Sequence, residues 1–462
     1  MDFEESVRYM DGLLRFGWKL GNERFAVLCA RLGDPHRRYP VIHIAGTKGK
    51  GSTTALAAAI LQRSGYTVGS YFSPYVYDVR ERVQVNGELI PRDDFARLMT
   101  LIRSHVEVIA ETEMGQTTEF ELKTILAFLY FAERKVDYAC IEVGLGGRLD
   151  ATNVVNPLVT VITNIGLDHT LILGDTHALI AAEKAGILKQ NIPCITATDN
   201  AEALDVIERI AAERSVPITY VRRGFPQSAS GEHTEGEQGN MVLVDADEEH
   251  FAIRTPLHNY TGLIMGMGGK YQQVNAACAV SAVETALTLH GKKLDETAVR
   301  TALKTTEMPA RLSIVQLKQG PLVVLDGAHN ALAAEGLADS VATLRKQYGV
   351  DRMLLVVGML NGHAPEGVVA PLAVLSERVY VCAPDWKRAL PVEEVADAAR
   401  QFAADVAVFP SVREAATAAL GDAEEGTLVL VTGSFYTVGE VPMETLADWR
   451  AAALASRCST GK

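Results

Sequence analysis

The clearest candidate for chemistry is a glycine-rich segment, Gly46-Thr47-Lys48-Gly49-Lys50-Gly51-Ser52. Glycines let backbone N–H groups approach a phosphate closely, and a following helix points its positive N-terminal end at the anion. In such a loop Lys50 would supply a positive charge for the phosphates and Ser52 a hydroxyl near a metal ion. The segment departs from the pattern GxxxxGK[ST], because Ile44 occupies the first glycine position and Gly51 separates Lys50 from Ser52. A glycine-rich turn capping a helix is the alternative, but a strand predicted before the segment and a helix predicted after it favour a phosphate loop.

Three polar residues further along the chain could bind a metal ion or a substrate. Glu142 lies near the C-terminal end of an apolar run, and α/β sheets place their ligands at that edge. Taken alone, Glu142 is equally compatible with an ion-paired or helix-capping carboxylate. His169 taken alone is best explained as a helix cap, and Lys184 as a solvated helix lysine.

The composition is that of an ordinary globular protein. The chain has 462 residues, of which 48% are hydrophobic and 22% charged, and its net charge of −13 argues against a dedicated nucleic-acid binder. A local basic pocket for a small anion remains compatible with that charge. We expect no signal peptide after the acidic start MDFEESVRYM, no transmembrane helix and no membrane partner. The six cysteines form no CxxC pair, so we expect buried free thiols in a cytoplasmic protein.

Short apolar runs alternate with helical patterns from about residue 40 onward, and this alternation predicts a mostly parallel α/β sheet. A polar stretch over Arg222–Asn240 is expected to be an exposed loop. The expected strands are Val41–Ala45, Thr67–Tyr71, Val136–Val143, Leu158–Thr163, Pro193–Ala197 and Ile218–Val221, with a hairpin of Met241–Val244 and Phe251–Ile253. The expected helices are Thr53–Arg63, Glu121–Arg134, Thr176–Lys189, Tyr271–His290 and Asp295–Lys304, and Gly46–Ser52 is expected to be a loop.

A second alternating series begins after Pro309 and predicts a separate α/β domain of ordinary size. Its expected strands are Leu322–Leu325, Met353–Val357, Val379–Cys382, Val406–Phe409 and Leu428–Val431. The expected fold is therefore α/β with two domains. Residues 1–305 would form a P-loop-type, mostly parallel sheet with flanking helices, and residues 306–462 a smaller Rossmann-like domain.

The glycine-rich segment resembles the phosphate loop of the Mur ligase superfamily, whose members join an amino acid to a carboxylate using ATP. Other motifs, in family order over nearly the whole chain, resemble the folylpolyglutamate synthase/dihydrofolate synthase branch. They are Phe72-Ser73-Pro74, Arg80-Glu81-Arg82, Phe120-Glu121, the segment EVGLGGRLDATN from Glu142 to Asn153, Leu167-Asp168-His169-Thr170, Glu183-Lys184-Ala185-Gly186-Ile187, Asn275, Pro309-Ala310-Arg311, Leu325-Asp326-Gly327-Ala328-His329-Asn330 and Gly433-Ser434-Phe435-Tyr436-Thr437-Val438. The chain departs from the family at Lys48, where Asn is usual, at Tyr75, where His is usual, and at Ala310 within a PGR motif.

The resemblance implies a role for each matching residue. Lys50, Lys184 and His169 would be catalytic, with Lys184 carbamylated. Mg²⁺ would be held by Ser73, Glu142 and His169, and ATP by Gly46–Ser52 with Asn275, Arg311 and Asp326. The pterin substrate would contact Thr118, Phe120, Glu121, Leu149, Asp150 and Ala151.

Several of these residues have a structural alternative when each is taken alone. Asn275 could be a helix-surface amide, Arg311 a linker salt bridge, Asp326 a turn-forming residue and Phe120 a core residue. A further candidate pair, His329 and Asn330, could be the N-cap of the next helix.

The implied reaction is ATP-dependent addition of L-glutamate to dihydropteroate, to folylpolyglutamate or to both, through an acyl phosphate. We expect a monomer that acts on these small molecules with ATP and Mg²⁺ and binds no nucleic acid. The alternatives are a monofunctional folylpolyglutamate synthase or another Mur-type ligase. Cell-wall Mur ligases carry a UDP-binding domain before the phosphate loop, and only 45 residues precede Gly46. A non-catalytic ATP-binding protein is disfavoured because binding alone would not require Lys50, Glu142, His169 and Lys184 together.

Overall fold

The computed structural model describes residues 1–13, 21–224, 241–246 and 250–460, with side chains as far as residue 455. This part of the chain divides into two units. Unit 1 contains Met1–Tyr75, Val79–Gly266 and Tyr271–Thr306, and unit 2 contains Val76–Asp78, Met267–Lys270 and Glu307–Lys462. None of the described helices is long and apolar enough to cross a membrane.

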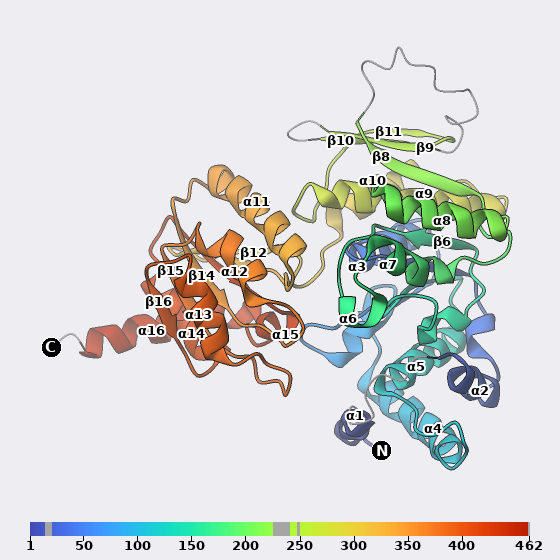
Figure 1. Cartoon of the computed structure of the whole chain (residues 1–462), viewed down its shortest axis with the longest axis horizontal. Coiled ribbons are helices and arrows are strands. Elements are labelled where there is room, and N and C mark those ends of the chain that lie inside the picture. Colours follow the sequence, from blue (N-terminus) through green and yellow to red (C-terminus); the bar gives the residue numbers. More distant parts are fainter. Residues whose placement is uncertain (14–20, 225–240, 247–249, 461–462) are drawn as a thin grey trace. The chain divides into compact units, whose positions relative to one another are not determined.

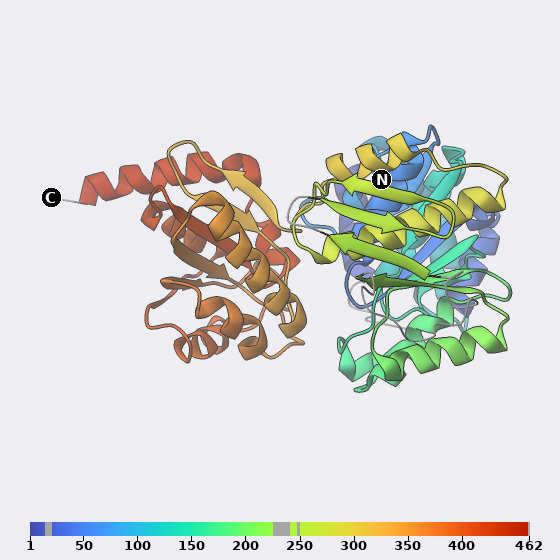
Figure 2. The ribbon, with the colours of Figure 1, turned by 90° about the horizontal axis from the view of Figure 1, so that it is seen from above.

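Unit 1 is built on an eleven-stranded sheet in the order β11-β10-β9-β8-β7-β6-β1-β5-β2-β3-β4. The strands from β2 through β9 in this order are parallel, and antiparallel pairs extend the sheet at both edges. In Figures 1 and 2 the β9–β11 edge is the lime group beside α9 and α10. The strands are β1 (Val41–Ala45), β2 (Val68–Tyr71), β3 (Val83–Val85), β4 (Glu88–Leu89), β5 (Tyr138–Glu142), β6 (Val159–Ile162), β7 (Cys194–Thr196), β8 (Ile218–Arg223), β9 (Met241–Ala246), β10 (Phe251–Arg254) and β11 (Asn259–Leu263).

Helices cover both faces of this sheet, and the central strand β1 is buried along its whole length. Four of its five residues are apolar, as expected for a parallel strand covered on both faces, and the fifth is the buried His43. Helices α3 and α9 pack against each other and against the central strands. The unit 1 helices are α1 (Phe3–Gly12), α2 (Glu23–Arg31), α3 (Lys50–Arg63), α4 (Arg92–Ala110), α5 (Glu119–Glu133), α6 (Thr170–Leu173), α7 (His177–Lys184), α8 (Ala201–Glu213), α9 (Tyr271–Leu289) and α10 (Glu296–Thr305).

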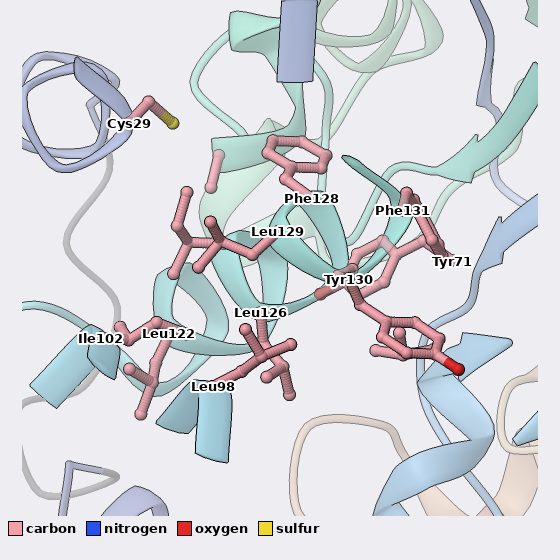
Figure 3. Packing of buried hydrophobic residues seen from close by; sticks show 14 of the residues in the cluster. Cys29, Tyr71, Leu98, Ile102, Leu122, Leu126, Phe128, Leu129, Tyr130 and Phe131 are labelled. Carbon is pink, nitrogen blue, oxygen red and sulfur yellow. The ribbon is translucent and has the colours of Figure 1, made fainter. Parts of the chain in front are cut away.

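A large apolar core holds helix α5 in place. Leu122 and Leu126 of α5 lie against Leu98 and Ile102 of α4 (Figure 3), and all four side chains are fully buried. At about 25 cal/mol per Å² of apolar surface, burial of each such side chain favours folding by about 1.5–3 kcal/mol. This packing fixes the N-terminal end of α5, where Thr118 and Phe120 lie.

Unit 2 has a six-stranded sheet in the order β12-β13-β17-β14-β15-β16, in which only β12 is antiparallel. Helices lie on both faces, as in a doubly wound fold. The strands are β12 (Ser313–Gln316), β13 (Leu322–Leu325), β14 (Arg352–Val357), β15 (Arg378–Val381), β16 (Val406–Val408) and β17 (Thr427–Thr432). The helices are α11 (Ala331–Tyr348), α12 (Pro365–Ala373), α13 (Val392–Arg400), α14 (Val412–Asp422), α15 (Phe435–Gly439) and α16 (Leu446–Thr460).

The predicted α/β class and parallel sheets are confirmed, with local corrections. Helix α3 already begins at Lys50, so the expected loop Gly46–Ser52 is shorter than predicted. Helix α7 ends at Lys184, where a 3₁₀ turn follows, and Arg222 and Arg223 belong to strand β8 rather than to the polar loop. The rest of that expected loop, 225–240, lies outside the described residues. Neither the short strands β3, β4, β11 and β12 nor the helices α1, α2, α4, α6 and α8 were predicted from the sequence.

Candidate active site

The glycine-rich loop leaves β1 and enters α3 with two glycines in backbone conformations that favour glycine. Gly46 has φ 147° and Gly49 has φ 82°. A Cβ atom on Gly46 would collide with Oγ1 of Thr163, and one on Gly49 with Oδ1 of Asn275. The loop therefore runs directly against the buried Asn275 of α9, a residue 226 positions later in the chain. The surface-amide interpretation of Asn275 is wrong.

Gly49→Ala should weaken nucleotide binding without unfolding the protein. The added Cβ meets the Asn275 amide, and the positive φ disfavours alanine, so the loop must shift. We expect the KM for ATP to rise at least about tenfold, equivalent to about 1.4 kcal/mol. Gly65→Ala at the end of α3 is the matched control, because it has φ 91° but no neighbouring atom within 4 Å. Equal effects of the two substitutions would mean that backbone strain, rather than the contact with Asn275, is responsible.

Hydrogen bonds to the end of β6 hold the same loop in place. The Thr47 hydroxyl donates to the Gly166 carbonyl (3.1 Å) and accepts from the Gly166 N–H (3.0 Å). The Lys48 N–H donates to Oδ1 of Asn164 (2.8 Å), and the Thr163 hydroxyl donates to the Lys48 carbonyl (2.5 Å). The loop is therefore preorganised by its surroundings.

Three lysines gather at this loop. Nζ of Lys50 donates to the carbonyls of Gly46 (3.0 Å) and Thr47 (3.4 Å), and Nζ of Lys184 also donates to the Gly46 carbonyl (2.9 Å). Lys48 pairs with Asp168 at 3.4 Å. Asp168 offsets the Lys48 charge, and the Lys50 charge beside this pair favours binding of an anion such as a polyphosphate.

Lys184 is buried, with 4% of its surface exposed, so its interpretation as a solvated lysine is wrong. Burial, and next the positive charge of Lys50, lower the pKa of Lys184 to about 7. A substantial fraction of this amine is therefore neutral near pH 7, and only the neutral amine is nucleophilic.

The segment containing Gly147 and Arg148 packs closely against the segment from Glu183 to Gly186, and this packing positions Lys184. The Arg148 N–H donates to the Glu183 carbonyl (2.8 Å), and their side chains form an ion pair at 2.7 Å. A Cβ on Gly147 would lie 2.9 Å from the Lys184 carbonyl. Only glycine allows this approach, which directs the Lys184 side chain toward the phosphate loop.

Glu142 and Ser73 are brought together at the ends of β5 and β2. The Ser73 N–H donates to Oε2 of the buried Glu142 (2.9 Å). Carboxylate and hydroxyl oxygens suit Mg²⁺, which keeps several waters and often shares substrate phosphates. His169 is the N-cap residue of α6, at φ 51°, and its side chain makes no capping bond. Within the described ranges no group of three His, Cys, Asp or Glu side chains could hold a metal ion alone. The protein oxygens thus fit a partial coordination shell that is completed by ligands such as phosphate.

Asp150 lies at the end of a chain of buried hydrogen bonds. Its Oδ1 accepts from the N–H (2.9 Å) and hydroxyl (2.5 Å) of Thr152, and its Oδ2 accepts from the Leu145 N–H (2.8 Å). Nε2 of His43 lies 2.9 Å from the Thr152 hydroxyl. Burial lowers the pKa of His43 to about 3, so the ring is neutral. Because the Thr152 hydroxyl donates to Asp150, it accepts from Nε2 of His43. Leu149 is partly exposed and Ala151 is buried beside Asp150.

Thr118 and Glu121 form the capping box of α5. Each side chain bonds the backbone N–H of the other, and Glu121 also forms a two-pronged ion pair with Arg24 at 2.9–3.1 Å. Their polar atoms are therefore used to start the helix. Phe120, between them, is partly buried and lies directly against Gly144, so that a Cβ there would collide with its ring.

In unit 2 the predicted residues gather at the end of β13. Asp326 accepts from the N–H groups of Leu312 (2.8 Å) and Ala328 (2.9 Å), which is the turn-forming role. The Arg311 guanidinium lies 4.6 Å from the centroid of the Phe435 ring. Asn330 caps α11 as predicted, with Oδ1 accepting from the Ala333 N–H (3.0 Å). The Nδ1 of His329 lies 2.8 Å from the Gly327 carbonyl oxygen.

Sequence reasoning missed four residues of unit 1: Arg24, His43, Thr152 and Asp168. Arg24 and His43 are far from their partners in sequence, and no local pattern marks them. Thr152 and Asp168 lie inside motifs that carry the family resemblance, close to Asp150 and His169.

Comparison with known proteins gives one consistent result. Residues 44–283 match the Mur ligase middle domain, and residues 310–435 match the Mur ligase glutamate ligase domain. The dihydrofolate synthase/folylpolyglutamate synthase of Bacillus subtilis is 36% identical over 95% of this chain and 98% of its own length. The folylpolyglutamate synthase of Lacticaseibacillus casei is 31% identical over 96% and 98%.

Among solved structures, Escherichia coli FolC in complex with DHPP and ADP has the same fold. Its TM-score is 0.83 at 31% identity, over 97% of this chain and 99% of that chain.

Proposed function

The chain belongs to the dihydrofolate synthase/folylpolyglutamate synthase family of Mur ligases, and we propose that it uses ATP to join L-glutamate to dihydropteroate and to reduced folates. The observation that carries this proposal is the meeting of Lys48, Lys50 and Lys184 at a preorganised phosphate loop. A chain of this family with these groups in place is an ATP-dependent ligase.

In our proposal the loop Gly46–Ser52 and Asn275 hold the ATP phosphates, and Lys50 turns from the loop carbonyls to the transferring phosphate. Arg311 and Asp326 belong to the nucleotide site contributed by the C-terminal domain, residues 306–462. Arg311 supplies charge, and Asp326 keeps the Arg311 turn in shape through its bond to Leu312. The N-terminal domain, residues 1–305, carries the phosphate loop and the acceptor site.

Mg²⁺ would be held by Ser73, Glu142 and His169 together with the phosphates, and it would neutralise charge on the transferring group. Lys184 would be carbamylated. This modification replaces a buried positive charge with a negative one and supplies oxygen atoms beside the metal ligands. The low pKa of Lys184 supports it, because CO₂ reacts with the neutral amine.

The acceptor's pterin ring would lie against Phe120 and be bound by Asp150, with Leu149 and Ala151 lining the site. Oδ1 of Asp150 already accepts two hydrogen bonds from Thr152, so Oδ2, which accepts from the Leu145 N–H, is the oxygen that would bind a ring N–H. Thr118 and Glu121 would act indirectly, by fixing the start of α5 and thus the Phe120 ring.

The reaction then needs no covalent bond to the enzyme. An oxygen of the acceptor carboxylate attacks the γ-phosphorus, the bond to ADP breaks, and an acyl phosphate forms. The glutamate amine attacks the acyl carbon and loses a proton, inorganic phosphate leaves, and an amide bond results. Positioning and charge stabilisation supply the catalysis.

The purified enzyme tests this function when it is given ATP, Mg²⁺ and glutamate with dihydropteroate or tetrahydrofolate separately. Product from both acceptors is expected. Product from tetrahydrofolate alone would establish the second candidate, a monofunctional folylpolyglutamate synthase, which is the name of the Lacticaseibacillus casei relative. Product from neither would reject the proposal.

Asp150→Asn should raise the KM for the pterin acceptor about tenfold or more, which corresponds to loss of one bond to a charged group. The KM for ATP should change little. Thr152→Val is the matched variant, because it keeps the carboxylate but removes the hydroxyl that orients it, so a smaller effect is expected. An equal rise in both KM values for Asp150→Asn would instead indicate general damage to the loop.

We further propose that the protein works as a cytoplasmic monomer with no nucleic-acid or membrane partner. Five cysteines with described side chains, Cys29, Cys140, Cys194, Cys278 and Cys382, are buried and free, as expected in a reducing compartment. The sixth, Cys458, lies outside the described side chains.

A further inference from the structure

Two buried cations in unit 1 share one aromatic ring. The guanidinium carbon of Arg82 lies 5.7 Å, and Nζ of Lys123 5.3 Å, from the ring centroid of Tyr75. Arg82 is 8% exposed and Lys123 is 3% exposed. Charged side chains this buried need partners, so the surroundings of each decide what the pair can do.

Arg82 is short of hydrogen-bond acceptors. Its Nε and Nη1 are buried and make no hydrogen bond within the described part of the chain. Its backbone is fixed, because its carbonyl accepts from the Phe72 N–H (3.0 Å). This bond places Arg82 beside the Phe72–Ser73 segment, where the proposed metal ligand Ser73 lies. A buried guanidinium with unused, fork-shaped donors is suited to a carboxylate.

Lys123 adds to the positive charge. It has one close carboxylate partner, Glu119, one turn earlier on α5. Burial, and next the charge of Arg82, lower the pKa of Lys123 to about 8, while Glu119 and Asp11 act in the opposite direction. The mutual effect of Lys123 and Arg82 means that their charges are close. One carboxylate from a ligand would relieve this repulsion.

The position of the pair limits what that ligand can be. On one side is Ser73, at the proposed phosphate-transfer end. On the other is Tyr71, whose side chain interacts with that of Arg82 and whose ring lies 6.3 Å from the ring of Phe120, part of the proposed pterin site. These contacts connect the pair both to the proposed phosphate-transfer end and to the proposed pterin site. A folate carries an α-carboxylate a few bonds from its reacting γ-carboxylate, whereas the only carboxylate of dihydropteroate is the reacting one.

Building on the proposed function, we propose that Arg82, Lys123 and Tyr75 form a subsite for the α-carboxylate of the substrate's terminal glutamyl residue. The Arg82 fork and the Lys123 ammonium bind the carboxylate, and the Tyr75 ring supports both cations. The subsite therefore favours folates over dihydropteroate in an enzyme that accepts both.

Kinetics with both acceptors test the subsite. Arg82→Lys keeps the charge but loses the fork, and Lys123→Met keeps the length but loses the charge. Each should raise the KM for tetrahydrofolate about 10- to 100-fold, as expected for a lost bond between charged groups. The KM for dihydropteroate should stay close to that of the wild type. Arg80→Met is the matched control from the same 3₁₀ turn and should change neither value. Equal rises for both acceptors would overturn the proposal.

A second experiment needs only the wild-type enzyme. It therefore tests the subsite even if a variant fails to fold or dihydropteroate is not a substrate. The probe is tetrahydrofolate with its α-carboxylate converted to an amide. The wild type should bind this analogue about 10- to 100-fold more weakly than tetrahydrofolate. If the analogue and tetrahydrofolate bind with equal affinity, and tetrahydrofolate is still ligated, the subsite proposal is wrong and the proposed function stands. Absence of any ligation would instead reject the proposed function, and the subsite with it.

Discussion

Lys50→Ala should lower kcat about 100- to 1000-fold while leaving the fold intact. The side chain lies at the first position of α3 and reaches back over the phosphate loop to the Gly46 and Thr47 carbonyls. From that position its ammonium group can stabilise the negative charge that develops on the transferring phosphate. Removal of one such preorganised donor costs about 2.7–4 kcal/mol of transition-state stabilisation. The measurement is the rate of ADP formation at saturating substrates.

Two controls separate this effect from damage to the helix. Arg63→Ala removes an exposed cation from the last turn of the same helix and should leave kcat unchanged. Thermal unfolding of Lys50→Ala should stay near that of the wild type, because the side chain is only partly buried. Turnover close to that of the wild type in the folded variant would contradict the phosphate-loop assignment.

Lys184→Met should abolish ligation almost entirely, and wild-type activity should depend on bicarbonate. The proposed carbamate forms only from the neutral amine, so its yield should rise with pH through the Lys184 pKa of about 7. Intact-protein mass measured at neutral pH should show the carbamate increment. Lys189→Met is the matched control, because Lys189 is partly buried and its pKa is likewise lowered, but its Nζ donates to the Asn153 carbonyl instead of Gly46. Full activity of the Lys184 variant would contradict the carbamate role.

For unmodified Lys184, in CO₂-free buffer, we can predict the direction in which the free energy of unfolding changes with pH. The pKa of Lys184 is about 7 in the folded protein, against 10.5 for an ordinary lysine such as that of the unfolded chain. Between these values the unfolded state binds more protons, so the free energy of unfolding should rise with pH across that window. Lys184→Met should lose this part of the slope. Chemical denaturation at several pH values measures it, and identical slopes would contradict the burial of an unmodified amine.

The parallel core of both sheets could be predicted because its strands are short, apolar and separated by helical patterns. The edge strands could not. Strand β4 has two residues, and β11 has buried side chains only at Tyr260 and Leu263, so neither has a clear period. Unit 2 also includes two short segments from the first part of the chain, Val76–Asp78 and Met267–Lys270. Each is too short to show a hydrophobic pattern that would assign it to unit 2.

Site residues were predictable in identity, through the resemblance, but not in environment. Lys184 is buried because it bonds Gly46, 138 residues away, and no local pattern contains that contact. Thr118 and Glu121 show the opposite case. Their spacing is the S/T-x-x-E signature of a capping box, so the sequence itself could have assigned them a structural role.

The acyl-phosphate route is the central claim, and transfer of labelled oxygen tests it most directly. Dihydropteroate or tetrahydrofolate is prepared with heavy oxygen in the reacting carboxylate and is incubated with enzyme, ATP, Mg²⁺ and glutamate. If the carboxylate attacks the γ-phosphorus, one labelled oxygen must leave with inorganic phosphate in every turnover. Amide product accompanied by unlabelled phosphate would contradict the mechanism.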